Sequence, residues 1–275
     1  MDTTNGTAPS LPIALTSFVI TVIISRLITK NNHHVDVQPS SEPDDEQTYP
    51  QHPSLPNPSQ TLTLIKTRRS IFTKQFSGKP VHQSIVNDML EAARWAPNHH
   101  LTEPWRFIVF ESPGARLELS GLLCKLYSDA QEAKGKPILQ AKIDKKLKGA
   151  QLSSHIIAIC VSTNGVKNPF VEEIASVSMA VQNMHLMATC HGVGAYWSSG
   201  GIYGPASSSS KVGIENPEEL SQFLVRHLPY HKSGESITCL GWLYIGDFYG
   251  DLNVGLMKKW PSGLRKPIEE KSSWW

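Results

Sequence analysis

Apolar side chains recur every three or four residues over several stretches of this chain, which is the period of a helix with one buried face. The helices expected from this period begin at about residue 59, at Pro80, and over 114–134 and 171–190. Pro97 ends the second of them, because a proline inside a helix removes a hydrogen bond and clashes with the preceding turn. The fourth helix ends at a turn containing Gly192 and Gly194, a common way for helices to stop.

Short runs of β-branched and aromatic residues lie between these helices and predict strands. The runs are at 106–110, 156–161, 195–197 and 236–245. Helices therefore alternate with about four strands, which predicts an α/β or α+β domain.

The composition changes near residue 60. Residues 1–60 hold 2 of the 26 Lys+Arg, 6 of the 24 Asp+Glu and 8 of the 19 prolines, so they carry a net charge of −4 while the remainder carries +6. We therefore expect one folded domain at 59–275, preceded by a leader at 1–30 and a Pro-rich acidic linker at 31–58. Such a linker buries too little apolar surface to order itself.

The leader contains an apolar run at 11–28 with a single charge, Arg26. A helix that spans a membrane needs about 20 such residues, so this run predicts a membrane anchor. Arg26 and Lys30 follow it, and positive charges on that flank predict that the folded domain faces the cytoplasm. A cleaved or organelle-targeting peptide and an amphiphilic arm are the open alternatives.

Several classes of site are not indicated by the sequence. No Gly-rich dinucleotide or P-loop motif is present, and the four cysteines are too far apart for a zinc ribbon. His227 and His231 have metal-ligand spacing, but Pro229 interrupts the helix that this spacing needs. A formal charge of +2 gives no indication of nucleic-acid binding.

Two segments carry candidate chemistry. Arg68, Arg69 and Ser70 end the first predicted helix, and arginine side chains suit bidentate binding of a phosphate. The polar loop at 94–107 leads through Pro104 and Trp105 into a predicted strand, which suits a planar polar ligand. Each segment alone fits a solvated pair of arginines or a packed turn equally well.

Four segments together resemble a known family. RRSIFTKQFSGKPV, EAARWAPNHHLTEPWRFIVF, AVQNMHLMATCHGVGAYWSSGG and CLGWLYIGD have the order and spacing of the FMN-dependent nitroreductase family, especially its short bacterial-type members. The resemblance covers about residues 60–270. It implies an α+β fold with a central, mostly antiparallel sheet flanked by helices, and a homodimer with FMN at its interface.

The resemblance also implies roles for individual residues. Arg68, Arg69 and Ser70 match the motif that holds the FMN phosphate and ribityl chain, and Arg265 matches a late basic residue at the phosphate. Further matches are Trp95 and His99 in a loop that reaches the cofactor from the partner subunit, Trp197, Ser198 and Ser199 along the flavin ring, and Met187, Ala188, Thr189, Cys190, His191 and Gly192 at an NAD(P) segment.

The function implied is an NAD(P)H oxidoreductase that passes electrons through FMN to a nitroaromatic, quinone or similar small acceptor by a ping-pong mechanism. The flavin supplies the redox chemistry, so no catalytic side chain is assigned. A dehalogenase, a flavin-fragmenting enzyme and a non-catalytic flavin-binding scaffold are the alternatives. Glu103 stands where long family members carry Gln. The six lysines of 134–148 fit a solvated helix or lid, with a basic binding patch as the alternative.

Overall fold

The computed structural model describes residues 55–163, 165, 167–200, 216–228, 234–249 and 266–273. The chain divides into two compact units, Met1–Pro53 and Ser54–Trp275, and all described residues belong to the second. The predicted anchor at 11–28 and the phosphate candidate Arg265 lie outside the described residues. Among the helices that are described, none has the length and apolar character needed to cross a membrane.

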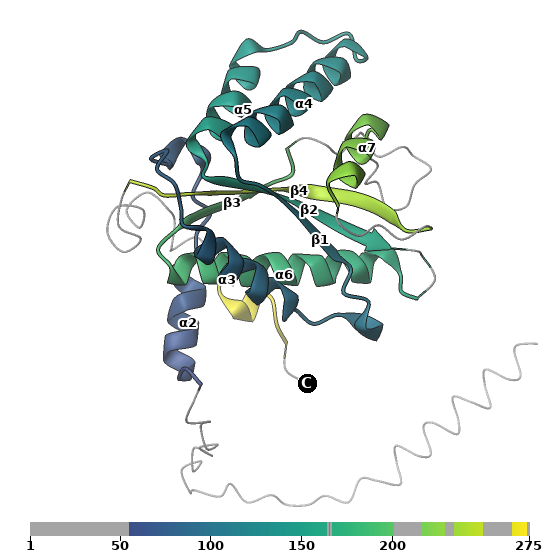
Figure 1. The fold of residues 1–275 in the computed structure, drawn as a ribbon. Helices are drawn as coiled ribbons and strands as arrows, with labels where there is room; N and C mark the ends of the chain where they lie inside the picture. The colour runs from purple at the N-terminus through teal and green to yellow at the C-terminus, as the bar shows by residue number, and fades with distance from the viewer. Residues whose placement is uncertain are drawn as a thin grey trace, which may run out of the picture. The chain divides into compact units, whose positions relative to one another are not determined.

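A four-stranded antiparallel sheet forms the centre of the folded unit (Figure 1). Its strands are β1 (Trp105–Phe110), β2 (His155–Thr163), β3 (Gly194–Ser198) and β4 (Ser236–Gly246), in the order β1-β2-β4-β3. Helices cover both faces of the sheet, so nearly every side chain of β2 is buried. The expectation of an α+β fold with a mostly antiparallel sheet between helices is confirmed.

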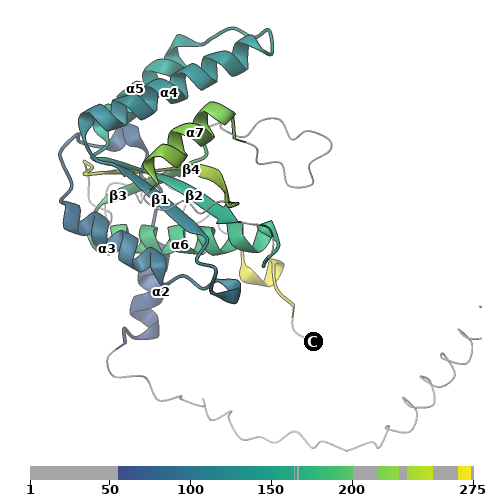
Figure 2. The same cartoon turned by 45° about the vertical axis from the view of Figure 1, so that its right-hand side comes forward.

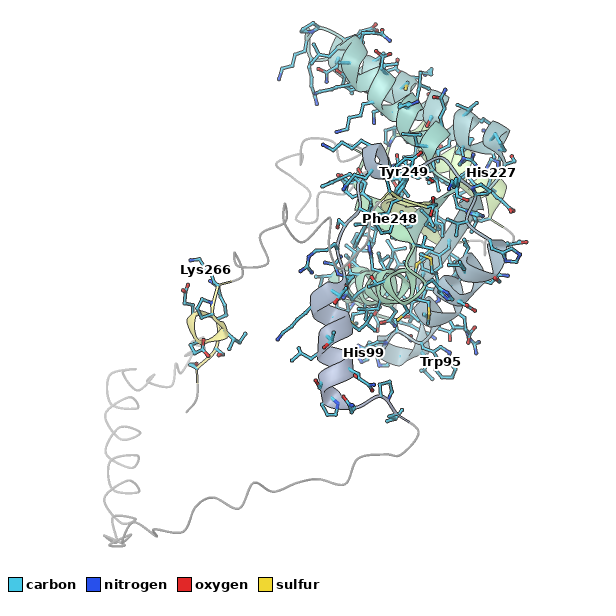
Figure 3. All side chains as sticks on the ribbon, turned by 90° about the vertical axis from the view of Figure 1, so that its left-hand side faces the viewer. Trp95, His99, His227, Phe248, Tyr249 and Lys266 are labelled. Carbon is cyan, nitrogen blue, oxygen red and sulfur yellow. The ribbon has the colours of Figure 1, made fainter. Side chains whose placement is uncertain are left out.

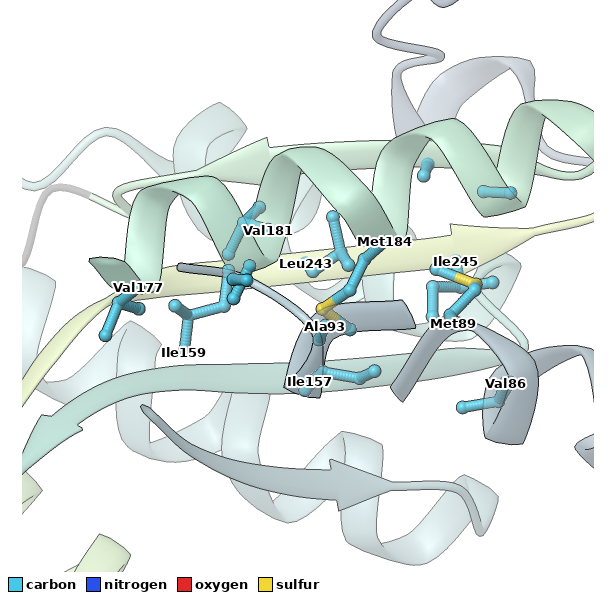
Figure 4. Close-up of a cluster of buried hydrophobic side chains, with 14 of the residues drawn as sticks. Val86, Met89, Ala93, Ile157, Ile159, Val177, Val181, Met184, Leu243 and Ile245 are labelled. Atoms are coloured by element: carbon cyan, nitrogen blue, oxygen red, sulfur yellow. The ribbon is translucent and has the colours of Figure 1, made fainter. Parts of the chain in front are cut away.

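Helices α3 (Gln83–Arg94) and α6 (Phe170–Cys190) pack on one face of the sheet. Because side chains alternate along a strand, β2 directs Ile157 and Ile159 to this face. There they meet Met184 of α6 and Met89 of α3, all fully buried (Figure 4). This cluster fixes the long axis of α6 along the sheet.

Helices α4 (Pro113–Glu132), α5 (Gln140–Leu152) and α7 (Glu218–His227) lie on the opposite face (Figure 2). The alternate residues of β2, Ile156 and Ala158, point to this side and share a core with α4 and α7. Helix α5 contributes far less, since its buried residues are Gly149 and Ala150. The remaining helical segments are α2 (Pro58–Thr67) and the 3-10 turns η1 (Thr73–Gln75), η2 (His99–Leu101) and η3 (Ile268–Glu270).

A β-bulge interrupts the pairing of β2 with β4. Cys160 pairs with Cys239, whereas its neighbour Ile159 pairs with Gly241, so β4 has one extra residue here. Gly241 has a φ of 135°, and a Cβ at this position would lie 2.4 Å from the carbonyl oxygen of Ser198. Only glycine allows the end of β3 to approach β4 so closely, and this approach sets where the chain leaves the sheet after Ser198.

The segment after α2 is attached to the same end of the sheet. Ile71 N–H donates to the Ala195 carbonyl at 3.0 Å, and Phe76 forms a bridge with Phe248. The ring of Phe76 lies over Gly194 and Gly246, which are paired across β3 and β4, and a Cβ on Gly246 would meet that ring at 2.5 Å. The glycines thus leave room for Phe76, which holds the segment in place.

Some predicted boundaries differ from the structure. Helix α3 begins at Gln83 rather than at Pro80, with the His82 ring accepting a hydrogen bond from Ser84 N–H. The chain between Pro80 and His82 is extended, so Val81 N–H instead donates to the buried Ser154 hydroxyl. Helix α7 was not predicted from the sequence, although Leu220, Phe223 and Leu224 have helical spacing and are buried.

Candidate functional site

A cavity of about 570 Å³ lies where β3 ends, between η1 and α5. Its walls come from three parts of the chain, which are residues 72–74, the helix α5, and residues 198–200. Tyr196 and Tyr244 complete the lining. This volume lies within the range of sites that hold small organic ligands or cofactors.

Aromatic rings form one wall of the cavity. The rings of Phe72 and Tyr196 have centroids 4.7 Å apart, and Tyr244 lies 6.3 Å from Tyr196. Burial raises the pKa of Tyr244, which therefore remains a neutral phenol. This wall offers apolar surface and weakly polar hydroxyl groups to a planar ligand.

Lysines form another part of the lining. Lys142, Lys145, Lys146 and Lys148 of α5 line the cavity, and Lys74 joins them from η1. Lys146 is half-buried, and its Nζ donates to the carbonyl oxygen of Gly200 at 3.1 Å, which ties α5 to the chain after β3. Burial lowers the pKa of Lys146, an effect that Cys124 opposes and the charges of neighbouring lysines reinforce.

The arginine motif lies just before the cavity in the chain. Arg68 caps the C-terminus of α2, where its backbone N–H donates to the Leu64 carbonyl. The Arg69 guanidinium donates to the carbonyls of Lys66 and Arg68, which curls that side chain back over the end of the helix. Ser70 follows, and two residues later Phe72 enters the lining of the cavity.

A buried histidine lies close to this motif. His185 of α6 is 6% exposed, and its Nδ1 has no partner among the described residues. Burial, with a smaller contribution from the positive charge of Arg68, lowers the pKa of His185 to about 4. The ring is therefore neutral near pH 7, so it adds no positive charge beside Arg68.

The predicted flavin-ring segment is divided between the two faces of the sheet. Ser198 and Ser199 line the cavity. Trp197 points to the opposite face, where it packs against the core formed by α3 and α6, because successive side chains of β3 alternate. Tyr196, which the sequence did not single out, takes a place in the cavity wall beside Ser198.

Trp95 and His99, both labelled in Figure 3, are not among the residues that line this cavity. Trp95 follows α3 and is 72% exposed, with its Nε1 donating to Glu91 at 2.8 Å. His99 begins η2 and pairs with Glu172 at 2.7 Å. Both lie in an exposed loop that is anchored by Asn168, whose side chain contacts the His99 carbonyl and the ring of His100.

The predicted NAD(P) segment forms the C-terminal end of α6, also outside the cavity. Ala188 is buried and Met187 packs beside it, whereas Cys190 is exposed. His191 pairs with Asp88 of α3 at 3.0 Å, and Gly192 takes a φ of 68° that ends the helix. These contacts show that residues 187–192 form the C-terminal end of a helix.

Four of the five lysines that line the cavity belong to the segment 134–148, for which the sequence predicted a solvated helix or lid. Lys142, Lys145, Lys146 and Lys148 do lie on a helix, and Lys146 is the half-buried member of the group. Lys142 lies three residues before Lys145 and four before Lys146, and Lys148 lies three after Lys145, and this spacing was the available signal. It indicates that they share a face, but which structure that face meets depends on the tertiary fold.

Comparison with known proteins gives consistent matches. The model of the nitroreductase family matches residues 65–221. YfhC of Bacillus subtilis (strain 168), provisionally named an NAD(P)H nitroreductase, is 27% identical over 181 residues, which are 66% of this chain and 90% of that protein. YdjA of Escherichia coli K12, with the same provisional name, is 28% identical over 180 residues, which are 64% of this chain and 92% of that protein.

Two crystal structures share the fold. A nitroreductase-like family protein from Bacillus cereus superimposes with a TM-score of 0.52 at 23% identity, over 82% of this chain and 96% of that chain. A Desulfovibrio desulfuricans protein, provisionally named a nitroreductase and crystallised with FMN, gives a TM-score of 0.51 at 20% identity, over 79% of this chain and 96% of that one.

Proposed function

The chain belongs to the nitroreductase family, and on this premise we propose that it is an NAD(P)H oxidoreductase that uses FMN to reduce a small acceptor such as a nitroaromatic or a quinone. The observation that carries the proposal is the cavity between η1, α5 and the end of β3, which combines an aromatic wall with cationic side chains. The names of the relatives YfhC and YdjA, and the FMN in the Desulfovibrio structure, support the same activity.

The residues present fit an FMN molecule. Phosphate requires cationic donors, which Arg68 and Arg69 supply at the end of α2 immediately before the cavity. A planar ring system requires an apolar surface, which Phe72 and Tyr196 provide, and Ser198 and Ser199 add hydroxyl groups beside it. We propose these residues, with Ser70 and Arg265, as the cofactor-binding set.

When bound, FMN supplies the hydride and electron transfer, so this chain's own residues have to bind and orient the ligands. Tyr244 is a neutral hydroxyl, and Lys146 fixes the backbone at Gly200. We assign no catalytic side chain. The nicotinamide donor and the acceptor use the same cavity in turn, which predicts ping-pong kinetics.

We further propose that a second copy of the chain completes the site. Trp95 and His99 lie outside the cavity of their own chain, in an exposed loop whose apolar members Trp95 and Leu101 are 72% and 84% exposed. Exposed apolar groups of this size favour a protein contact. A homodimer would bring this loop of one protomer to the cavity of its partner.

The decisive experiment is a visible absorption spectrum of the purified full-length protein, recorded before and after anaerobic addition of NADPH or NADH. The proposal expects the bands of oxidised flavin, and it expects them to bleach with at least one donor. Bands that persist with both donors would favour a flavin-binding scaffold or a flavin enzyme with another reductant. A colourless protein that takes up no added FMN would contradict the proposal.

For the location of the protein, we propose that residues 11–28 anchor it to a membrane with the folded unit facing the cytoplasm. The support is the sequence of that segment and the positive residues that follow it. Fractionation of cells checks the proposal. The full chain should remain in the membrane pellet after an alkaline wash, and a chain lacking residues 1–53 should not.

A further inference from the structure

Five lysines converge on the cavity, and no carboxylate is among the described residues that line it. Lys142, Lys145, Lys146 and Lys148 come from α5, and Lys74 comes from η1. Elsewhere in the described part of the chain, lysines form ion pairs, as Lys125 does with Asp129 and Glu219. Five lysines around one cavity are a feature that binding of a neutral acceptor does not require.

The contacts of these lysines leave their charge available to a ligand. Lys146 donates to a carbonyl oxygen, and Lys142 lies 5.5 Å from the ring centroid of Tyr127, so neither contact brings a negative charge. The carboxylate of Asp144, on the same helix, accepts from Gln140 at 2.9 Å and is not part of the lining. Lys142 and Lys145 each disfavour the charged form of Lys146, which indicates mutual repulsion. An anion between them would relieve it.

The FMN phosphate does not account for this charge if Arg68 and Arg69 hold it, as the proposed function states. We therefore propose that the preferred acceptor is a planar aromatic that carries a carboxylate or sulfonate, which enters the cavity beside the flavin with its anion toward the lysines of α5. This inference rests on the proposed function and names the substrate class of the same cavity. The acceptor is favoured over a neutral one because five lysines and three aromatic side chains line the same cavity.

The test compares two probes of nearly equal shape, 4-nitrobenzoate and 4-nitrobenzamide, on the flavin-loaded full-length protein. Calorimetry measures binding of each probe to the oxidised protein at 50 and 200 mM NaCl, and steady-state kinetics give kcat/KM for each. We expect the benzoate to bind about fivefold more tightly at low salt, and this preference to shrink at high salt because the lysines are partly solvated.

Two matched double variants locate the effect. Lys145→Gln with Lys148→Gln removes two exposed lysines of the cavity, whereas Lys134→Gln with Lys136→Gln removes two exposed lysines outside it. The first pair leaves three of the five lysines, so it should lower the preference for the benzoate, both in binding and in kcat/KM, without abolishing it. The second pair should leave the ratio unchanged. The quantity compared among the proteins is the ratio of benzoate to benzamide. The two probes differ in reduction potential by the same amount in every protein, so this difference does not affect the comparison.

The outcomes separate this inference from the proposed function. Flavin that bleaches with NADPH, with equal binding of both probes or equal effects of the two double variants, would overturn the charge preference and leave the oxidoreductase intact. A clear preference for the benzoate in a protein that no nicotinamide reduces would support an anion-selective cavity and overturn the proposed reaction.

Discussion

Two adjacent arginines at the end of α2, Arg68 and Arg69, are the residues that we propose for binding the FMN phosphate. Arg68 is the C-cap of the helix, and the chain that follows runs alongside β3, since Ile71 N–H donates to the Ala195 carbonyl. If the two arginines hold the FMN phosphate, each charge-assisted contact contributes about 1.5–3 kcal/mol.

Replacing both arginines with alanine should therefore empty the protein of flavin. The ratio of flavin absorbance to protein absorbance in the purified variant measures this loss. Arg226→Ala is the matched control, since Arg226 is an exposed arginine of α7 that lies 6.0 Å from the ring of Phe223. Full flavin occupancy in the double variant would show that the phosphate lies elsewhere.

His185 should make the stability of the fold depend on pH. Its pKa is about 4 in the folded protein and near 6.5 when unfolded, so between these values the unfolded chain binds the additional proton. Stability is thus retained above about pH 6.5 and falls as the pH drops toward 4, by an amount on the order of 3 kcal/mol at most.

Urea unfolding at pH 7 and pH 5 checks this sign. His185→Gln should show a smaller loss of stability on acidification than the natural chain. Burial also lowers the pKa of His155, which will retain part of the pH dependence in the variant. Equal losses in both proteins would mean that His185 titrates normally.

At the level of elements, the bulge of β4 determines where β3 can end. A methyl group at Gly241 would meet the Ser198 carbonyl at 2.4 Å, and the φ of 135° is unfavourable for any other residue. Gly241→Ala should therefore destabilise the fold by about 2–3 kcal/mol and also weaken flavin retention, because Ser198 and Ser199 would shift.

Gly121→Ala is the control for this substitution. Gly121 lies on α4 with open space around its Cβ position, so alanine should be neutral or slightly stabilising there. Denaturant midpoints of the two variants give the comparison. A Gly241→Ala protein as stable as the natural chain would show that β3 tolerates a shift away from β4.

The sequence predicted most of the helices and strands, but it did not predict the cavity. Strands β2 and β4 are long apolar runs, and α6 carries apolar residues over six turns, so their patterns outweigh local ambiguity. Helix α7 was not predicted because it has only 10 residues, too few for its apolar period to stand out. The cavity joins η1, α5 and β3, which are far apart in sequence, and periodicity within each segment cannot reveal how they meet.

For the whole molecule, the residue at which an N-terminally truncated chain begins decides whether helix α2 keeps its N-cap. Asn57 caps α2, with its side chain accepting from Gln60 N–H at 2.8 Å while Gln60 returns a contact to Asn57 N–H. The chain 54–275 should therefore be yellow and dimeric, as light scattering and absorbance would show. The chain 59–275 loses this cap, which costs about 1 kcal/mol, and should release flavin more readily.

The state of the 54–275 chain also tests the proposed dimer. If it is a monomer that retains all its flavin, the loop holding Trp95 and His99 is not needed for the site. If dilution releases monomer and flavin together, the second copy contributes to binding.

The sparse packing of α5 gives the cavity wall a low local stability. Only Gly149 and Ala150 of this helix are buried, while the strands behind it are buried almost completely. Segments with few buried contacts open with less free energy than the whole molecule needs to unfold. Backbone amides of α5 should thus exchange hydrogen with water much faster than those of β2. Ligand entry would then follow from brief detachment of a single helix while the sheet stays folded.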